Sequence, residues 1–385
     1  MGKDERRAYL EAIRDRYLAS DRQTKKGILD EFCQVCDYNR KYAIRLLHTP
    51  RKRTRQRPGR KPLYRCPELV KALKRIWLAT DQVCSKKLAE AIPLWLPFYG
   101  KLSPTTRSQL LAISPASIDR LLAPIRATTR LKGRCTTKPG RLLRQQIPIR
   151  THHWDISQPG FMEADTVAHC GNSMAGNFIW SLTLTDIHTG WTEARATWNN
   201  GATGVLQQIK DIQANLPFPL KGFDCDNGGE FLNHYLLRYF TDHKPKIKFT
   251  RSRPYRKNDN AHVEQKNWSY VRYLLGHDRL DNPQLVDLIN DLYANQWSLL
   301  QNHFHPTLKL LQKKRINSRY YKKYETPQTP YQRLLTSSHI PIETKEALKY
   351  LHESLDPFAL KEQIDKQLKT IFRLVSVTSN VRQRL

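Results

Sequence analysis

The chain has 385 residues, of which 39% are hydrophobic and 10% aromatic, and it carries a formal net charge of +30. This composition supplies enough apolar side chains for more than one packed core, which excludes a disordered basic tail. The charged N-terminal segment and the lack of an apolar run of about 18 residues predict neither a signal peptide nor a membrane span.

The basic residues are concentrated in the first part of the chain. Residues 1–155 contain 35 Lys/Arg and 13 Asp/Glu, a net +22, whereas residues 156–385 contain 30 and 22, a net +8. A protein that binds a polyanion such as double-stranded DNA needs a positive surface of this kind. We therefore expect the main electrostatic contact with DNA to lie before residue 156.

Residues 1–50 are predicted to form a helix-turn-helix DNA-binding domain. Apolar residues recur at helical spacing in the first part, and two further helices are predicted around a turn at 37–39. Cys33 and Cys36 could begin a zinc site, but no second Cys or His pair follows at finger spacing. Two core cysteines on one helix are the alternative that we favour. The seven cysteines are scattered, which indicates a reducing cytoplasm rather than a disulfide framework.

Residues 51–66 are predicted to be a basic linker or arm, with eight basic residues and no acidic one. The string RPGRKP within it resembles an AT-hook, in which Arg side chains enter the narrow minor groove of A·T-rich DNA. Arg57, Arg60 and Lys61 are therefore candidate DNA contacts. A plain basic linker is the alternative.

A second helix-turn-helix DNA-binding domain is predicted at 67–126. Two amphipathic helices open it, and a further helix begins after Ser114, the expected N-cap, with a proline at its first position. Ser117 and Arg120 would lie on the exposed part of this short recognition-type helix and are candidate DNA contacts. Residues 127–155 are predicted to be a second basic linker.

From residue 156 the periodicity changes to that of an α/β domain. Three consecutive strands, then helix, strand, helix, strand and helix, predict a catalytic core at 156–305 with a mixed five-stranded sheet. The predicted strands are 161–168, 177–187, 190–197, 220–226 and 247–252, and the predicted helices are 201–216, 229–243, 259–276 and 283–303. Residues 306–385 are predicted to be a basic, largely helical C-terminal extension, with helices at 342–354 and 359–373.

Three carboxylates in this core give the strongest chemical signal: Asp165, Asp226 and Glu264. Acids from separate elements would repel one another in a dry cleft unless divalent cations neutralise them. Such cations activate one oxygen and stabilise another during phosphoryl transfer. The three acids are therefore candidate catalytic residues and metal ligands.

Spacing alone leaves alternatives for the first two acids. Glu163 shares a strand face with Asp165, and Asp224 shares one with Asp226. The Asn-Gly-Gly turn after Asp226 favours that residue, because open α/β sheets build their sites at the C-terminal rim of the strands. Glu230, which follows, is expected to open a helix and to complement its dipole.

Glu264 is placed by helical spacing on one stripe with Trp268, Val271 and Leu275, the face expected to pack on the sheet. A carboxylate in that stripe needs a positive partner. Bound metal is one candidate, and a buried ion pair with a nearby arginine is the other. The candidate arginines are Arg251, Arg253 and Arg256.

The basic segment ahead of the last acid is a candidate DNA contact. Arg253, Arg256 and Lys257 would grip phosphates beside the reacting bond, and Tyr255 would stack against a base. An ordinary solvated loop is the alternative. Arg272 is expected near the site-facing side of the following helix, where it either meets a DNA end or only flanks the apolar stripe.

The blocks PGFMEADTVAHCG, FDCDNGGEF and RPYRKNDNAHVEQKNWSYVR resemble the DDE transposase and retroviral integrase superfamily, and more narrowly the insertion-sequence transposases with an integrase catalytic core. The resemblance covers roughly 155–335. It implies a ribonuclease H-like core with Asp165 on the first strand, Asp226 after the fourth and Glu264 on the following helix. It also implies two Mg2+ ions, for which Mn2+ can substitute. With them the enzyme cuts DNA with water and directs the freed 3′-OH at target DNA.

Two features depart from the usual pattern of that superfamily. The 37 residues between Asp226 and Glu264 (264 − 226 − 1) are more than is usual. The basic residue that many members place seven positions after the glutamate is here Val271, with Arg272 one step further on.

The sequence therefore predicts a multidomain insertion-sequence transposase. It would recognise terminal inverted repeats through its helix-turn-helix units, act on double-stranded element ends and target DNA, and work as a homodimer or higher homo-oligomer. The expected location is the bacterial cytoplasm, with nucleoid association when the protein is bound to DNA. A metal-dependent nuclease that cuts without joining is one alternative, and a non-catalytic DNA-binding regulator or decayed transposase is the other.

Overall fold

The computed structural model describes residues 2–49, 63–64, 66–128, 157–225, 230–231, 233–251, 266–317 and 319–382. These residues divide into two compact units, Met1–Leu63 and Tyr64–Leu385. Most of the predicted linkers at 51–66 and 127–155 lies outside the described residues.

The first unit consists of three helices, α1 (Lys3–Ala19), α2 (Arg22–Cys36) and α3 (Arg40–His48), which confirms the predicted helices. Phe32 and Cys36 are fully buried in its core. The close cysteine pair therefore lies on one helix, with Cys36 in the core and Cys33 half-buried against it, so the expectation of two core cysteines is right for Cys36. Sequence-specific DNA binding by this unit stays a prediction.

Short polar side chains fix the ends of these helices. The Asp21 carboxylate accepts a hydrogen bond from the Thr24 backbone N–H at 2.8 Å, and the Asn39 side-chain oxygen accepts one from the Lys41 N–H at 3.0 Å. These bonds satisfy first-turn N–H groups that have no partner within the helix. Asp37 ends α2 in the left-handed region, with a φ of 54°. The predicted turn is confirmed.

Four helices open the second unit: α4 (Pro67–Ala79), α5 (Ser85–Trp95), α6 (Pro104–Leu111) and α7 (Pro115–Thr128). The Ser114 hydroxyl accepts a hydrogen bond from the Ser117 N–H at 3.3 Å, which confirms the predicted N-cap of α7. Ser117 is half-buried and also accepts a hydrogen bond from the Ser114 hydroxyl, whereas Arg120 is exposed.

A mixed five-stranded sheet follows, as predicted. Its strands are β1 (Phe161–Ala168), β2 (Ile179–Asp186), β3 (Thr192–Trp198), β4 (Gly222–Cys225) and β5 (Lys248–Arg251). The spatial order is β3-β2-β1-β4-β5. β1 pairs antiparallel with β2 and parallel with β4, so it is the central strand of the sheet.

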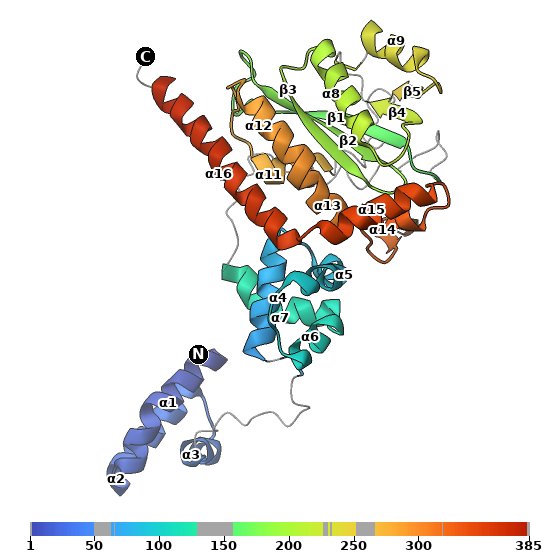
Figure 1. The fold of residues 1–385 in the computed structure, drawn as a ribbon. Helices are drawn as coiled ribbons and strands as arrows, with labels where there is room; N and C mark the ends of the chain where they lie inside the picture. Colours follow the sequence, from blue (N-terminus) through green and yellow to red (C-terminus); the bar gives the residue numbers. More distant parts are fainter. Residues whose placement is uncertain are drawn as a thin grey trace. The chain divides into compact units, whose positions relative to one another are not determined.

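The two faces of the sheet belong to different cores (Figure 1). Met162 and Ala164 of β1 enter the core that α8 (Ala202–Asn215) and α9 (His234–Asp242) cover. Val167 enters the other core, on the opposite face. The helical elements on that opposite face are η3 (Asn267–Arg272), α11 (Tyr273–Leu275), α12 (Leu285–Asp291), η4 (Leu292–Trp297) and α13 (Ser298–Phe304).

The helices at the start of the second unit share this opposite-face core. The Trp95 indole N–H of α5 donates to the Phe304 carbonyl of α13 at 3.0 Å. Lys361 Nζ forms an ion pair with Asp81 at 2.8 Å, which ties the loop after α4 to the C-terminal part of the chain. The segment predicted as a separate domain at 67–126 is therefore part of one compact unit with the sheet.

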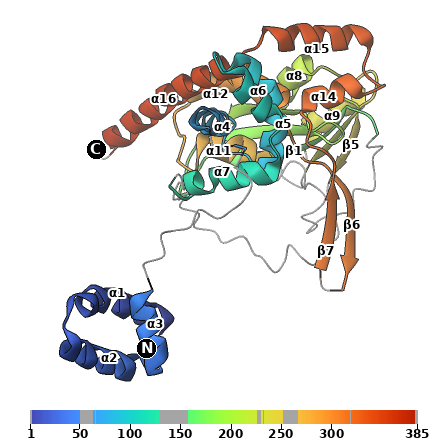
Figure 2. The same cartoon turned by 90° about the horizontal axis from the view of Figure 1, so that it is seen from below.

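The C-terminal part contains a hairpin and three helices: β6 (Leu310–Ile316), β7 (Arg319–Tyr324), α14 (Pro330–Thr336), α15 (Ile342–Ser354) and α16 (Pro357–Arg382). The last two confirm the predicted helices. The antiparallel β6–β7 hairpin was not expected in a largely helical extension, and Figure 2 shows it extending away from the sheet. Across the described ranges, no helix has the length and apolar character that crossing a bilayer requires.

Three buried histidines make the fold sensitive to acid. Burial lowers the pKa of His169, His303 and His305 to about 3, below the ordinary value near 6.5. Below about pH 6.5 the unfolded chain therefore binds protons that the folded chain does not, and the free energy of unfolding falls by about 1.4 kcal/mol per pH unit for each histidine. We expect urea midpoints to drop steeply between pH 7 and pH 5, and His305→Gln to reduce that slope. A slope in His305→Gln equal to that of the wild type would contradict this account.

Candidate active site

Asp165 lies in the second half of the central strand β1, on the same strand face as Glu163 and Val167. Its neighbours on β1, Ala164 and Thr166, point to the other face. Glu163 is buried, whereas Asp165 is half-buried. Of the two acids that the sequence left as alternatives on this strand, Asp165 is therefore the more exposed.

A network of short hydrogen bonds orients the Asp165 carboxylate. The Asn267 side-chain amide donates to Asp165 Oδ2 at 2.6 Å, and the Thr166 backbone N–H donates to Oδ1 at 2.7 Å. Thr183, which pairs with Asp165 across β2, donates to the Asn267 side-chain oxygen at 2.5 Å. Thr183 of β2 thus fixes the Asn267 side chain, which in turn orients the Asp165 carboxylate. Sequence reasoning missed this residue, because a neutral amide on a helix gives no charge signal.

Two more carboxylates lie on the neighbouring elements. Asp224 of β4 accepts a hydrogen bond from the Thr250 hydroxyl of β5 at 2.6 Å. Glu230 accepts one from the Thr166 hydroxyl at 2.9 Å. The expectation that Glu230 opens a helix is wrong: it lies in a turn, and α9 begins only after the N-cap Asn233. Its carboxylate reaches β1 instead of a helix terminus.

The register of β1 and β4 relates the acids on the two strands. Phe161 pairs with Gly222 and Ala164 with Cys225, an offset of 61 residues (222 − 161). Glu163 accordingly pairs with Asp224. The last described pair stops one position before Asp165, and the residue 61 positions after Asp165 in the sequence is Asp226.

The helix that carries Asn267 does not follow the expected stripe. Residues 267–272 form a π-helix, which has more residues per turn than an α-helix. As a result Trp268 is 57% exposed, whereas Tyr270, Val271 and Leu275 are fully buried. The predicted stripe is right for Val271 and Leu275 and wrong for Trp268, because it assumed α-helical geometry.

Arg272 is tied to the end of β1. Its guanidinium donates to the Ala168 carbonyl at 2.8 Å and to the Gly276 carbonyl at 3.5 Å, and burial lowers its pKa. These contacts fix the helix against the C-terminal end of the central strand. They also place the Arg272 guanidinium next to β1, the strand that carries Asp165.

Several predicted site residues lie outside the described ranges. They are Asp226, Glu264, Arg57, Arg60, Lys61, Arg253, Tyr255, Arg256 and Lys257. Within the described ranges, no three His, Cys, Asp or Glu side chains are grouped closely enough to hold a metal ion. The acids of β1 and β4 offer oxygen donors, the ligand type that hard cations such as Mg2+ prefer.

Comparison with known proteins gives one relative over most of the chain. The uncharacterized protein y4rM of Sinorhizobium fredii (strain NBRC 101917 / NGR234) is 38% identical over 333 residues, which cover 84% of this chain and 93% of that protein. No family model matches the chain.

Two solved structures are similar to part of the chain. The integrase catalytic core domain of HTLV-2, in complex with magnesium in its dimeric form, is 18% identical and covers 39% of this chain and 90% of its own, with a TM-score of 0.28. The catalytic core domain of BIV integrase is 16% identical and covers 47% of this chain and 96% of its own, with a TM-score of 0.29.

Proposed function

The chain belongs to the family of the uncharacterized protein y4rM, and for this member we propose the function of a DNA transposase that frees 3′-OH ends of an element and joins them to target DNA. One observation carries the proposal. The 61-residue offset between β1 and β4 equals the sequence separation of Asp165 and Asp226 (226 − 165). We propose that this register continues by one residue, which would make the two acids neighbours on one face of the sheet.

Glu264 is the third member of the proposed site. It precedes Asn267 by three positions, the spacing that puts two side chains on one face of a helix. Asn267 is hydrogen-bonded to Asp165, so we propose that Glu264 lies close to the same carboxylate. The arrangement of strands around Asp165 is also the one that a ribonuclease H-like core implies, with an antiparallel pair on one side and parallel strands on the other.

The three acids would hold two Mg2+ ions, which supply charge neutralisation and Lewis acidity at the scissile phosphate when bound. The chain itself supplies position. Asn267 and the Thr166 N–H fix both oxygens of Asp165, and Thr183 fixes Asn267. No protein nucleophile is needed, because water and then the 3′-OH of DNA attack the phosphorus.

The experiment that tests this function uses the full chain with DNA that spans the junction between the element and its flanking sequence, together with Mg2+ and target DNA. We expect nicks at the element ends and products in which those ends are joined to the target, read on a sequencing gel. Nicks without joined products would support the nuclease alternative. Terminal-DNA binding without either product would support the regulator alternative.

Asn267 gives a prediction about how Asp165 is positioned. We expect Asn267→Ala to lower cutting and joining by roughly 10- to 100-fold and to raise the Mg2+ concentration needed, as is typical when a partner that orients a metal ligand is removed. The matched control is Asn295→Ala, which removes another Asn–Asp hydrogen bond of 2.6 Å from an exposed helix surface. Equal activity and an equal Mg2+ requirement in the two variants would remove Asn267 from the site.

The β6–β7 hairpin is a proposed surface for DNA. Residues 310–324 contain six basic residues, three tyrosines and no acid. Lys314, Lys322 and Lys323 are exposed, and the Tyr321 side chain is 58% exposed. A two-stranded ribbon with this charge fits the major groove or the phosphate backbone of a duplex.

Removing charge from the hairpin should weaken DNA binding without regard to sequence. We expect the triple variant Lys314→Ala, Lys322→Ala, Lys323→Ala to lower duplex affinity on terminal and random DNA alike. The slope of log K against log salt should become shallower by about 0.9 for each phosphate that the variant no longer neutralises. The control removes three exposed cations from α16, Lys366, Lys369 and Arg373. An unchanged salt slope in the hairpin variant would argue against DNA binding there.

A further inference from the structure

A cationic cavity of about 190 Å³ lies on the same side of the sheet as Asn267, and the proposed chemistry does not use it. Its wall is built from four parts of the second unit: α5 with the loop before it, the turn that follows β2, the segment from Lys266 to Tyr273, and the segment from α13 to α14. Four basic side chains line it. Lys87 comes from α5, Lys266 from the position before the π-helix, and Lys309 and Arg333 from the segment from α13 to α14.

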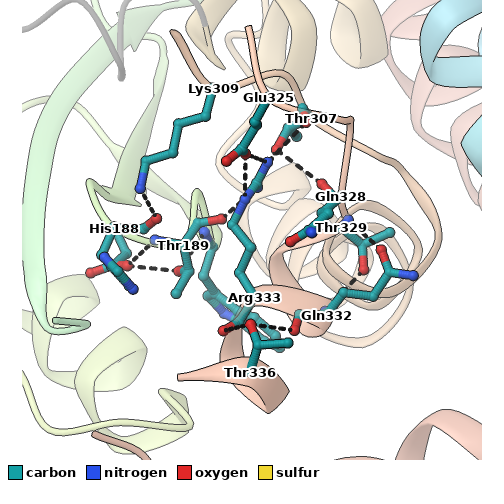
Figure 3. A network of polar contacts seen from close by, with 12 residues as sticks. His188, Thr189, Thr307, Lys309, Glu325, Gln328, Thr329, Gln332, Arg333 and Thr336 are labelled. Atoms are coloured by element: carbon teal, nitrogen blue, oxygen red, sulfur yellow. Dashed lines mark hydrogen bonds and ion pairs between the residues drawn. The ribbon is translucent and has the colours of Figure 1, made fainter. Parts of the chain in front are cut away.

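Two of these cations are fixed in the wall by other protein groups (Figure 3). Lys309 Nζ donates to the His188 carbonyl at 2.6 Å. Arg333 donates to the Thr189 carbonyl at 2.9 Å and to the Glu325 carboxylate at 2.5 Å. They give the cavity a rigid, positively charged side.

The carboxylates that line the cavity are engaged elsewhere. Asp186 accepts hydrogen bonds from the Gly160 N–H at 2.8 Å and from the Thr189 N–H and hydroxyl at 2.7 and 2.6 Å. Asp81 forms its ion pair with Lys361. Asp81 is thereby balanced by Lys361, and the charge of Asp186 acts on Lys309.

The other two cations have no counter-charge in the described part of the chain. Neither Lys87 nor Lys266 makes a hydrogen bond or an ion pair there. Lys266 Nζ lies 6.0 Å from the centroid of the Tyr270 ring, and burial lowers the pKa of Lys87. The buried Nε2 of His305 also has no hydrogen-bond partner among the described residues. Clustered cations without a counter-charge are costly, and a bound anion would offset that cost.

We propose that this cavity binds a phosphate-class anion, with the Lys87 and Lys266 ammonium groups as its ligands and Lys309 and Arg333 as the charged wall behind it. Lysine binds phosphate as a compact point charge. The volume leaves room for a phosphate together with ordered water. The ligand is either free inorganic phosphate or a backbone phosphate of bound DNA. Because the site uses none of the three acids, it does not depend on the proposed transposase activity.

The test measures phosphate binding by the full chain without Mg2+ or DNA. Inorganic phosphate is titrated against chloride at constant ionic strength, with the melting temperature and 31P NMR as readouts. We expect phosphate to raise the melting temperature of the wild-type protein more than chloride does. Lys87→Gln and Lys266→Gln should each weaken phosphate binding by roughly tenfold or more, because each removes a charged hydrogen-bond donor. The matched control is Lys86→Gln, the adjacent exposed lysine of α5.

Wild-type protein that responds equally to phosphate and chloride would overturn the proposal, as would a phosphate affinity unchanged in both lysine variants. If Lys87→Gln is unstable and melts far below the wild type, the proposal is still tested by Lys266→Gln and by the comparison of phosphate with chloride on the wild-type protein. A final arm adds duplex DNA. Displacement of phosphate by DNA identifies a backbone phosphate as the ligand, whereas simultaneous binding identifies free phosphate. Because neither Mg2+ nor a reactive DNA end is present, a failed titration counts against phosphate binding in the cavity and not against the proposed transposase activity.

Discussion

Asp165→Asn, Asp226→Asn and Glu264→Gln are each expected to abolish cutting and joining, with rates lower by roughly a thousandfold or more, while binding to terminal DNA is unchanged. A metal ion supplies several kcal/mol of charge stabilisation to the transition state, and about 1.4 kcal/mol corresponds to a factor of ten in rate. Because the three acids act as a unit, the loss of any one should cost about as much as the loss of all three. Rates should be measured by gel, and DNA binding by mobility shift at matched salt.

The same variants should not lose stability. Each substitution removes a negative charge from a cluster of like charges, so without metal the melting temperature should stay the same or rise. Asp224→Asn tests the alternative acid on β4 that the sequence left open, and it should retain activity because its carboxylate is bound to Thr250. Strand transfer retained by any of the first three variants would remove that residue from the site.

The triple variant Arg253→Ala, Arg256→Ala, Lys257→Ala is expected to lower cleavage and strand transfer by roughly a hundredfold, with a much smaller effect on affinity for the terminal repeat. These residues are proposed to hold the phosphates beside the reacting bond, and a small misplacement of that bond costs about this much. Recognition of the repeat would be supplied by the N-terminal helices.

Melting temperature and joining rate, measured on the same triple variant, separate the three interpretations of the segment that contains Arg253, Arg256 and Lys257. An unchanged melting temperature with strongly reduced joining supports binding to DNA. A lower melting temperature supports the buried ion pair with Glu264. An unchanged melting temperature with unchanged joining supports a solvated loop and ends the proposal. The exposed triple Lys366→Ala, Lys369→Ala, Arg373→Ala on α16 controls for the loss of positive charge.

Most of the sheet could be predicted from the sequence, because its strands show a clear period of two or a buried apolar run. β1 begins and ends at the predicted residues. The helices of the first unit were predicted by apolar residues at helical spacing, and α7 was predicted by Ser114 as its N-cap. The α6 helix was missed because its polar and apolar residues are not separated onto two faces.

The β6–β7 hairpin was missed for a different reason. Both strands carry basic residues on each face, and neither contributes to the described hydrophobic cores, so they lack the alternation that marks a half-buried strand. For the segment 67–126 the sequence predicts helices but not what they pack against. The helices are amphipathic, but the sequence does not tell which partner covers their apolar faces. In the structure residues such as Trp95 pack with the helices on the sheet.

The candidate site could be predicted only as a set of acids. The pairing of Glu163 with Asp224, and with it the offset of 61 residues, depends on strand register, which no local pattern determines. The hydrogen bond of Asn267 with Asp165 depends on how the helix approaches the sheet. The exposure of Trp268 depends on the π-helix, which helical spacing does not predict.

The most direct test of the proposed transposition uses pre-cut element ends. Full-length protein is incubated with Mg2+, target DNA and an element end that carries either a 3′-OH or a 3′-dideoxy terminus, and joined products are counted by sequencing. The account predicts joined products from the 3′-OH end alone, with equal binding of both ends, because the 3′-OH of DNA is the nucleophile. Target DNA that is cut equally with either end, without joined products, would contradict it.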